Sequence, residues 1–461
     1  MLSKETIKKV LDSALSTGGD FAEVFVEDNT KKTIVLISGK IEDIIGGQDY
    51  GIGIRVCKGL KSMYAYTNND GLESLLSTAK NAALALNKVE AGQSFNFNLE
   101  ETIPTNIHPI LLVPNDVETK YKISKLKIAY NAAKDYSPEI SQVTVSLQES
   151  DQKVQIANSN GLLVADRRVR TRISVQSIAE NGADKQTGSE SIGELQGFEL
   201  VENLDLVQLG KNASEMAVTM LHADYCKAGQ MPVAIEKGFG GVIFHEACGH
   251  SLEAASVAKG NSVFCDKLGE KIANEKITAI DDGTIKNAWG SMNVDDEGQP
   301  TQRNVLIEKG ILKSYLIDTF NAKRMNMAST GSGRRESYRF APTSRMTNTY
   351  IAPGEDEDEA IISSIEYGLY AKRLGGGSVN PITGEFNFLV ALGYIIRNGK
   401  ICEAVRGASL VGVGQKVLLD IDMVGKTLAY SPGMCGASSG SIPAHVGQPL
   451  IRVKELTVGG R

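Results

Sequence analysis

The chain opens with helix-like and strand-like patterns of apolar residues. Residues 3–17 carry Ile7, Val10, Leu11 and Leu15 at helical spacing, and Gly18-Gly19 ends the pattern. Short segments rich in β-branched and aromatic residues follow, separated by turn residues, at 21–26, 33–38, 51–56 and 61–67. An Ala/Leu-rich helix is expected over residues 72–87. Residues 1–90 are therefore expected to form a small α+β unit.

The pattern changes again beyond this unit. A polar, proline-containing connection at 90–115 leads to a predicted helix at 116–136, antiparallel strands over 141–180, and a helix at 204–224. From residue 231 the apolar segments lengthen and glycines become frequent. We therefore predict an α+β fold, with an N-terminal region of mixed helices and antiparallel strands. Residues 91–228 form the second unit of this region, after the unit at 1–90. A larger, strand-rich C-terminal domain, which carries the candidate metal-site helix, covers 229–461.

Composition and charge narrow the class of protein. The 461 residues are 42% hydrophobic and 23% charged, as in an ordinary globular protein. The net charge of −6 argues against nucleic acid as the main ligand, because phosphate binding needs a clustered positive surface. We see no signal peptide and no run near about 18 apolar residues, so we expect a cytoplasmic protein without a membrane span. The six cysteines are scattered, which indicates free thiols or ligands rather than disulfides.

The candidate chemistry lies in one apolar, helix-length segment of the C-terminal domain. His245 and His250, two of only five histidines, bracket Glu246 in the pattern H-E-x-x-x-H. Burying two imidazoles and a carboxylate without partners is costly, and a metal ion would satisfy all three. A regular helix places residues with this spacing about 140° apart. A widened turn such as a π-bulge, with Gly249 as its weak point, would let both histidines reach one ion. The alternative is a pair of ordinary core histidines.

A catalytic zinc site needs three protein ligands and an open position for water. The segment supplies two histidines, so the third ligand has to come from elsewhere. Glu253, three residues after His250, would complete a His₂Glu set. Cys435, in a glycine-rich turn, would complete a His₂Cys set. His445, Cys265 and Cys248 are further candidates, and local sequence leaves the choice open.

Two polar segments also deserve an interpretation. Residues 333–350 are rich in arginine and tyrosine, and one interpretation is that they anchor a peptide carboxylate or an oxyanion. Base rates favour instead a surface strand with solvated arginines or a dimer interface. The acidic residues 295–298 lack the spacing of a calcium loop, so they predict a turn.

Five motifs together carry a resemblance to a known family. They begin at Gly240, Asp295, Gly333, Arg345 and Gly433, and read GGVIFHEACGHSLEA, DDEG, GRRESY, RMTNTY and GMCG. In this order they resemble the TldD/PmbA family of metallopeptidases, and its TldD-like catalytic branch in particular. The resemblance runs through most of the chain and is densest in its second half.

The resemblance implies a site, a substrate class and an assembly. It implies one zinc ion per chain, held by His245, His250 and Cys435, with Glu246 as the catalytic base. The substrates would be short or unfolded peptides bound in an enclosed cavity, by residues that the motifs do not identify. The resemblance also implies a dimer, formed either with a second copy or with a PmbA-like paralogue that lacks the metal motif.

The expected function is therefore peptide hydrolysis by a metal-activated water. One alternative is another metal-dependent amide hydrolase that uses the same site. A second is a non-enzymatic, metal-stabilised peptide-binding or partner subunit, in which four protein ligands would close the zinc site. The intact Glu246 weighs against this alternative, because a structural metal site needs no base.

Overall fold

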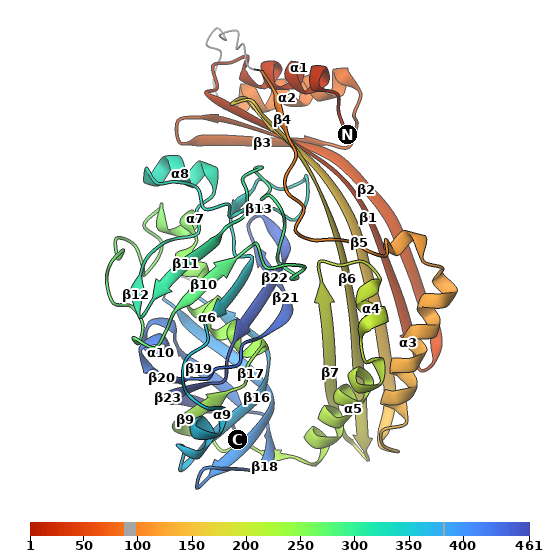
Figure 1. Cartoon of the computed structure of the whole chain (residues 1–461), viewed down its shortest axis with the longest axis vertical. Coiled ribbons are helices and arrows are strands. Elements are labelled where there is room, and N and C mark those ends of the chain that lie inside the picture. The colour runs from red at the N-terminus through yellow and green to blue at the C-terminus, as the bar shows by residue number, and fades with distance from the viewer. Residues whose placement is uncertain (87–97, 381–382) are drawn as a thin grey trace.

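A curved sheet of long strands builds the N-terminal half of the molecule (Figure 1). The computed structural model describes residues 1–86, 98–380 and 383–461. Within them this sheet has seven strands in the order β3-β2-β1-β5-β6-β4, with β7 also paired to β6. Their bounds are β1 (Phe21–Ile37), β2 (Lys40–Lys58), β3 (Lys61–Thr67), β4 (Glu100–Thr102), β5 (Ile140–Asn158), β6 (Leu162–Asn181) and β7 (Asp184–Glu194).

The strands are longer than the apolar pattern predicts. The strands predicted separately at 21–26 and 33–38 merge in β1, which ends one residue before Ser38, because β2 and β5 pair with the polar residues between them. Antiparallel pairing of β1 with β5 joins the predicted units 1–90 and 91–228 in a single sheet. The boundary expected at residue 90, and the last residue of the helix expected at 72–87, lie outside the described residues.

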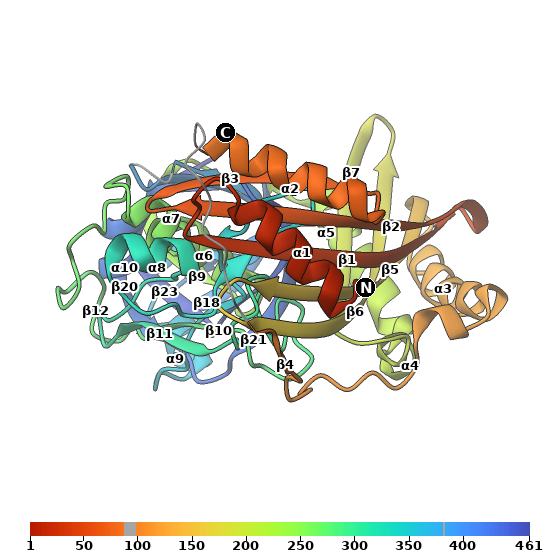
Figure 2. The same cartoon turned by 90° about the horizontal axis from the view of Figure 1, so that it is seen from above.

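Helices cover the two ends of this sheet separately. α1 (Lys4–Leu15) and α2 (Leu72–Leu86) lie side by side on one end (Figure 2), over a core that includes Val24 and Ile54. α3 (Thr119–Lys134) and α5 (Leu206–His222) pack on the other end, over a core that includes Ile34 and Val145. α4 (Glu199–Asn203) precedes α5. These ranges confirm the predicted helices near 116–136 and 204–224, and the apolar stripe predicted for α1 is buried.

In the described part of the chain, two further large sheets form the C-terminal half. One has six strands in the order β12-β11-β10-β15-β22-β21. Its strands are β10 (Ala279–Asp282), β11 (Arg303–Glu308), β12 (Ile311–Leu312), β15 (Asn348–Ile351), β21 (Ala429–Ala437) and β22 (Gly440–Gln448). The other has eight strands and contains β8 (Asp224–Tyr225), β9 (Gly229–Ile235), β16 (Tyr367–Val379), β17 (Glu385–Arg397), β18 (Lys400–Arg406), β19 (Ser409–Val413), β20 (Ile421–Val424) and β23 (Ile451–Gly459).

Short helices and a small hairpin complete this half. They are α6 (Val242–Ala247), α7 (Ala254–Val257), α8 (Thr319–Met325), α9 (Asp358–Ser363), α10 (Gly414–Asp420), and the hairpin of β13 (Gly333–Arg334) and β14 (Thr343–Ser344). α6 packs against strands of both sheets (Figure 1), and its residues are almost all buried. The predicted α+β class is confirmed. Among the described residues, no helix is long and apolar enough to cross a membrane.

Buried ion pairs join the N-terminal sheet to the C-terminal half. Arg55 of β2 contacts Glu23 of β1 at 2.8 Å and Glu297 of the C-terminal half at 2.5 Å. Arg168 of β6 contacts Asp296 at 2.5 Å, and Arg335 contacts Glu23 at 2.6 Å. All these side chains are at most 5% exposed. Each cation is therefore compensated across the interface rather than by water.

Replacing Arg55 tests this interface. Arg55→Met is expected to lower the free energy of unfolding by about 3–5 kcal/mol, because Glu297 loses its cationic partner while it stays buried. Arg339→Met is the matched control, since Arg339 pairs with Asp49 at the surface and is 43% exposed. The Arg339→Met substitution should lower the free energy of unfolding by less than about 1 kcal/mol. Urea denaturation of both variants measures the difference, and equal losses would contradict the assignment.

Candidate metal centre

The two motif histidines meet because the helix that carries the first one ends early. α6 stops at Ala247, and Cys248 leaves helical geometry with φ −133° and ψ −46°. A 3₁₀ turn, Gly249–Leu252, then carries His250. The chain therefore brings the histidines together by ending the helix, and not by the π-bulge that the spacing suggested as one way to widen the turn. Gly249 allows the backbone to pack closely against Met346, because a Cβ there would lie 2.3 Å from the sulfur of that residue.

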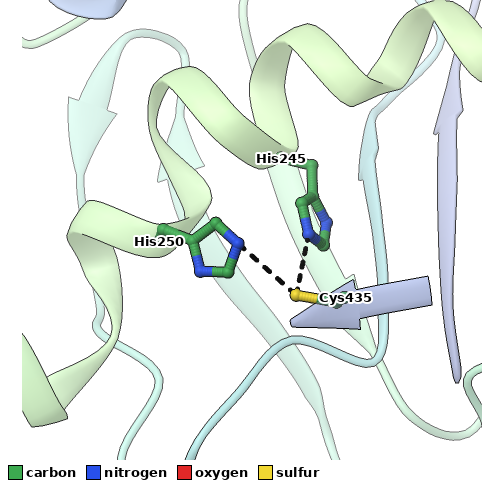
Figure 3. A group of neighbouring side chains, drawn as sticks. All are labelled: His245, His250 and Cys435. Atoms are coloured by element: carbon green, nitrogen blue, oxygen red, sulfur yellow. Dashed lines mark hydrogen bonds between the residues drawn. The ribbon is translucent and has the colours of Figure 1, made fainter. Parts of the chain in front are cut away.

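Three side chains converge on one point (Figure 3). His245 Nε2 lies 3.2 Å from Cys435 Sγ, and His250 Nε2 lies 3.4 Å from the same sulfur. Cys435 belongs to β21 and comes 190 residues after His245. The three donor atoms lie within 4.8 Å of one another. The structure thus brings together the two histidines and one of the candidate third ligands.

Glu253 lies on the other side of His250 from this donor group. Its carboxylate is 3.2 Å from His250 Nδ1, the ring nitrogen that does not face Cys435. Carboxylates in this position fix the orientation of a metal-binding imidazole. The structure therefore places Glu253 as a partner of His250 and outside the donor group.

Arg345 ties Glu253 to the strand that carries the cysteine. This fully buried guanidinium donates hydrogen bonds to the backbone carbonyl of Cys435 and to Ser439 Oγ at 2.9 Å. Its Nε lies 3.9 Å from Glu253. Contacts thus run from His250 through Glu253 and Arg345 back to Cys435. Sequence reasoning assigned no such role to Arg345, and its place in the RMTNTY motif was the only signal.

The charges in the group favour a thiolate. Burial alone would raise the pKa of the Cys435 thiol, but the neighbouring His245 and His250 hold it well below its usual value. Burial would likewise lower the pKa of His250, but Glu253 and then Cys435 raise it well above the usual value. A thiolate beside two imidazoles is a donor set that a divalent cation can bind in place of the protons.

The other candidate ligands lie outside this group. Burial raises the pKa of the Cys248 thiol, which suits an uncharged core residue. Cys265 donates a hydrogen bond to the carbonyl of Val257. His445 packs against the ring of Tyr430, and burial lowers its pKa to about 4. Among the described residues, the donor group consists of His245, His250 and Cys435.

Glu246 lines a cavity of about 190 Å³ together with His245 and Cys435. Its carboxylate is partly exposed and lies 3.8 Å from His250 Nε2. Gly375, Gly376 and Gly377 of β16 also line this cavity. The cavity therefore brings a carboxylate and a glycine-rich backbone to the donor group.

Most arginines of the segment 333–350 are buried, so the expected solvated surface strand is wrong for them. Arg334, Arg335 and Arg345 are at most 4% exposed. Arg334 and Arg345 donate to backbone carbonyls within the C-terminal half, and Arg335 donates to the carboxylate of Glu23 across the interface. The predicted turn at 295–298 is confirmed by a hydrogen bond from the Gly298 N–H to the Asp295 carbonyl.

The buried polar atoms of the group fit a metal ion. The Nε2 atoms of His245 and His250 lie 3.2 and 3.4 Å from the Cys435 sulfur, so three electron-pair donors face one buried point. In the absence of an ion, the two Nε2 atoms and the sulfur have few protons with which to form hydrogen bonds to one another. Two imidazoles and a thiolate next to a free carboxylate are the arrangement of a metal-dependent hydrolase.

Known proteins share this architecture. Sequence models for domain 1, the central domain and the C-terminal domain of the PmbA/TldA metallopeptidases match residues 22–86, 113–221 and 228–460. A Haemophilus influenzae protein named metalloprotease TldD homolog is 35% identical over 100% of this chain and 97% of its own. Its namesake from Buchnera aphidicola of Acyrthosiphon pisum is 34% identical over 96% and 93%.

Solved structures agree on the fold. A Thermotoga maritima protein described as a candidate modulator of a DNA gyrase has a TM-score of 0.81 and 22% identity, over 99% of this chain and 100% of its own. The chain therefore belongs to the TldD/PmbA family of metallopeptidases, in its TldD-like branch.

Glu253→Gln tests the orienting contact. Removing the charge next to His250 Nδ1 should weaken metal binding about tenfold, the lower end of the range for such partners. Glu246→Gln is the matched control, because it neutralises a carboxylate near the same histidine but not at Nδ1. Competition with a chromophoric chelator measures both affinities. Equal affinity in the wild type and Glu253→Gln would remove the orienting role.

Proposed function

We propose that this chain is a zinc-dependent peptidase that hydrolyses short or unfolded peptides, with Glu246 as general base. The observation that supports this most is the position of Glu246, which lines one cavity with His245 and Cys435. Membership of a metallopeptidase family supports the same reaction class. The carboxylate and the candidate ligands thus face the same space.

The donor atoms suit zinc. A tetrahedral zinc ion with ordinary bond lengths separates a nitrogen and a sulfur ligand by about 3.6 Å. The two observed N···S distances, 3.2 and 3.4 Å, need only a small expansion. A thiolate with two imidazoles is also a softer donor set than magnesium or calcium prefers. One ion per chain would be held by His245, His250 and Cys435.

The side chains have separate tasks in this proposal. Zinc, when bound, supplies a Lewis acid and lowers the pKa of a water molecule to about 7. Glu246 takes a proton from the water that attacks the scissile carbonyl and passes it to the leaving amine. Glu253 keeps the His250 ring in its orientation, and Arg345 holds the backbone of Cys435. The glycines of β16 leave room for a peptide backbone along the cavity wall.

The same geometry argues against a purely structural metal site. A structural zinc site is normally closed by four protein ligands. Glu253 contacts His250 Nδ1, and Cys248 lies outside the three-residue donor group found among the described residues. The proposed zinc ion therefore keeps one coordination position open for water. Another amide hydrolase with this site would differ in substrate, which profiling with peptides and acylated amines would reveal.

Assembly and location are also part of the proposal. We propose a cytoplasmic dimer, formed with a second copy or with a PmbA-like paralogue, as the family resemblance implies. The beginning of β2 supports an assembly, because it carries three exposed apolar side chains. Ile41, Ile44 and Ile45 are 36%, 50% and 62% exposed.

Cys435→Ala is expected to lose both zinc and peptide hydrolysis, because two histidines alone bind the ion weakly. The wild type should contain about one zinc per chain, as a tetrahedral site with three protein ligands requires. Cys265→Ala is the matched control, since Cys265 is a partly buried thiol outside the donor group. Metal analysis and hydrolysis of an unfolded peptide are measured on the same samples. Full zinc occupancy in Cys435→Ala would exclude this cysteine as a ligand.

Glu246→Gln is expected to keep its zinc and to lose turnover by about 10²- to 10⁴-fold, the range for loss of a general base. Glu359→Gln, in the exposed first turn of α9, is the control and should behave as the wild type. The measurement is kcat for peptide hydrolysis at equal zinc content. A wild-type rate in Glu246→Gln would remove this residue from the mechanism.

A further inference from the structure

A second, larger cavity lies between the N-terminal sheet and the C-terminal half. Its volume is about 370 Å³. Residues of β1, β5 and β6 form one wall, and Trp289, Arg334 and the β21–β22 hairpin form the other. Four arginines line it: Arg168, Arg170, Arg334 and Arg335. All four are at most 7% exposed, so solvent reaches little of their surface.

These four arginines fall into two classes. Arg168 forms ion pairs with Asp166 and Asp296, and Arg335 forms one with Glu23. Arg170 donates only to the backbone carbonyls of Trp289 and Ser291, at 2.9 and 3.0 Å. Arg334 donates to the carbonyl of Met346, and its Nε is buried without a partner. Within the described part of the chain, neither Arg170 nor Arg334 forms an ion pair.

The carboxylates of the cavity wall do not compensate these two charges. Glu149 is paired with Lys122, and Asp296 binds Arg168 and the backbone N–H of Arg335. Glu336 accepts the backbone N–H of Ser441 at 2.7 Å. An anion entering the cavity would therefore meet two buried guanidinium groups that form no ion pair within the described part of the chain.

The pKa values of Arg170 and Arg334 also indicate that their positive charges lie in an unfavourable environment. Burial, and then the charges of Arg334 and Arg168, lower the pKa of Arg170 to about 9. Burial also lowers the pKa of Arg334 to about 10, although Asp296 opposes this shift. Both cations are thus held in an unfavourable environment, which a bound anion would relieve.

We propose that Arg170 and Arg334 bind a carboxylate group of the peptide substrate. This inference rests on the proposed peptidase function. A carboxylate presents two oxygens that match the donor fork of a guanidinium group. In a peptide it comes either from the chain end or from an aspartate or glutamate side chain.

The cavity lies close enough to the metal centre for one peptide to reach both. Met434 lines this cavity and also the smaller one that holds Glu246. Its neighbour in β21 is Cys435, about 3.3 Å further along an extended strand. Trp289 of the larger cavity donates a hydrogen bond to the carbonyl of Gly433 in the same strand, at 2.8 Å. A carboxylate held by the arginines therefore places the peptide bonds a few residues away beside Glu246.

Binding of matched peptides tests this site without turnover. The protein is zinc-loaded Glu246→Gln, and the probe is N-acetyl-pentaalanine as the free acid and as the C-terminal amide, measured by calorimetry. A hydrogen bond to a charged group contributes about 1.5–3 kcal/mol, so the free acid should bind about 10- to 100-fold more tightly. A second pair of amidated peptides, with a central Asp or Asn, tests the side chain as the source. Equal affinities within both pairs would overturn the proposal.

Substitutions locate the effect. Arg170→Met and Arg334→Met, each in the Glu246→Gln background, should abolish the preference for the carboxylate while binding the amide or Asn peptide unchanged. A structural role of these arginines would instead weaken binding of both members of a pair alike. Arg339→Met, at an exposed arginine outside the cavity, is the control and should keep the preference. A preference that survives in both cavity variants would overturn the assignment, and the comparison of peptides on Glu246→Gln alone stands even if a variant does not fold.

The outcome separates this inference from the proposed function. Carboxylate-selective binding without hydrolysis of any peptide by the wild type would remove the peptidase function and leave the anion site. Hydrolysis of free acids and amides with equal KM, together with equal affinities in both peptide pairs, would leave the peptidase function and remove the anion site.

Discussion

Buried charges have to be paired across the interface between the N-terminal sheet and the C-terminal half, and much of the structure follows from this constraint. Arg55, Arg168 and Arg335 meet carboxylates from the facing side with almost no solvent contact. A buried ion without a partner costs several kcal/mol, so any docking of the two halves that leaves these charges buried and unpaired is disfavoured. That docking creates the cavity lined by Arg170 and Arg334 and sets it beside the β21–β22 hairpin.

The metal centre shows the same principle on a smaller scale. His245, His250 and Cys435 are costly to bury as isolated polar groups, yet the packing of α6 between two sheets forces them together. Glu253 and Arg345 then hold the orientation of the ring and of the strand. A site built in this way is preorganised, because its donors are positioned by buried contacts rather than by the ion alone.

Two cavities that share Met434 suggest a division of labour within the proposed peptidase. The smaller one carries the reacting groups and a glycine-rich wall, and the larger one carries Arg170 and Arg334, for which the described residues provide no ion pair. Binding energy gained far from the scissile bond can position that bond at the base. In this view the interface between the two halves serves substrate binding as well as stability.

The amino-acid sequence by itself determined the elements with a strong local signal. Amphipathic spacing located α1, α3 and α5, alternation located β5 and β6, and the H-E-x-x-x-H pattern located two of the three metal-binding candidates. Only the resemblance to a family favoured Cys435 over Glu253, since both residues are competent ligands. The tertiary structure decided where each lies, because β21 approaches the Nε2 atoms of both histidines while Glu253 approaches Nδ1 of His250. It also decided which arginines are buried, and whether they are paired, because burial depends on partners that are remote in the chain, such as Glu23 for Arg335.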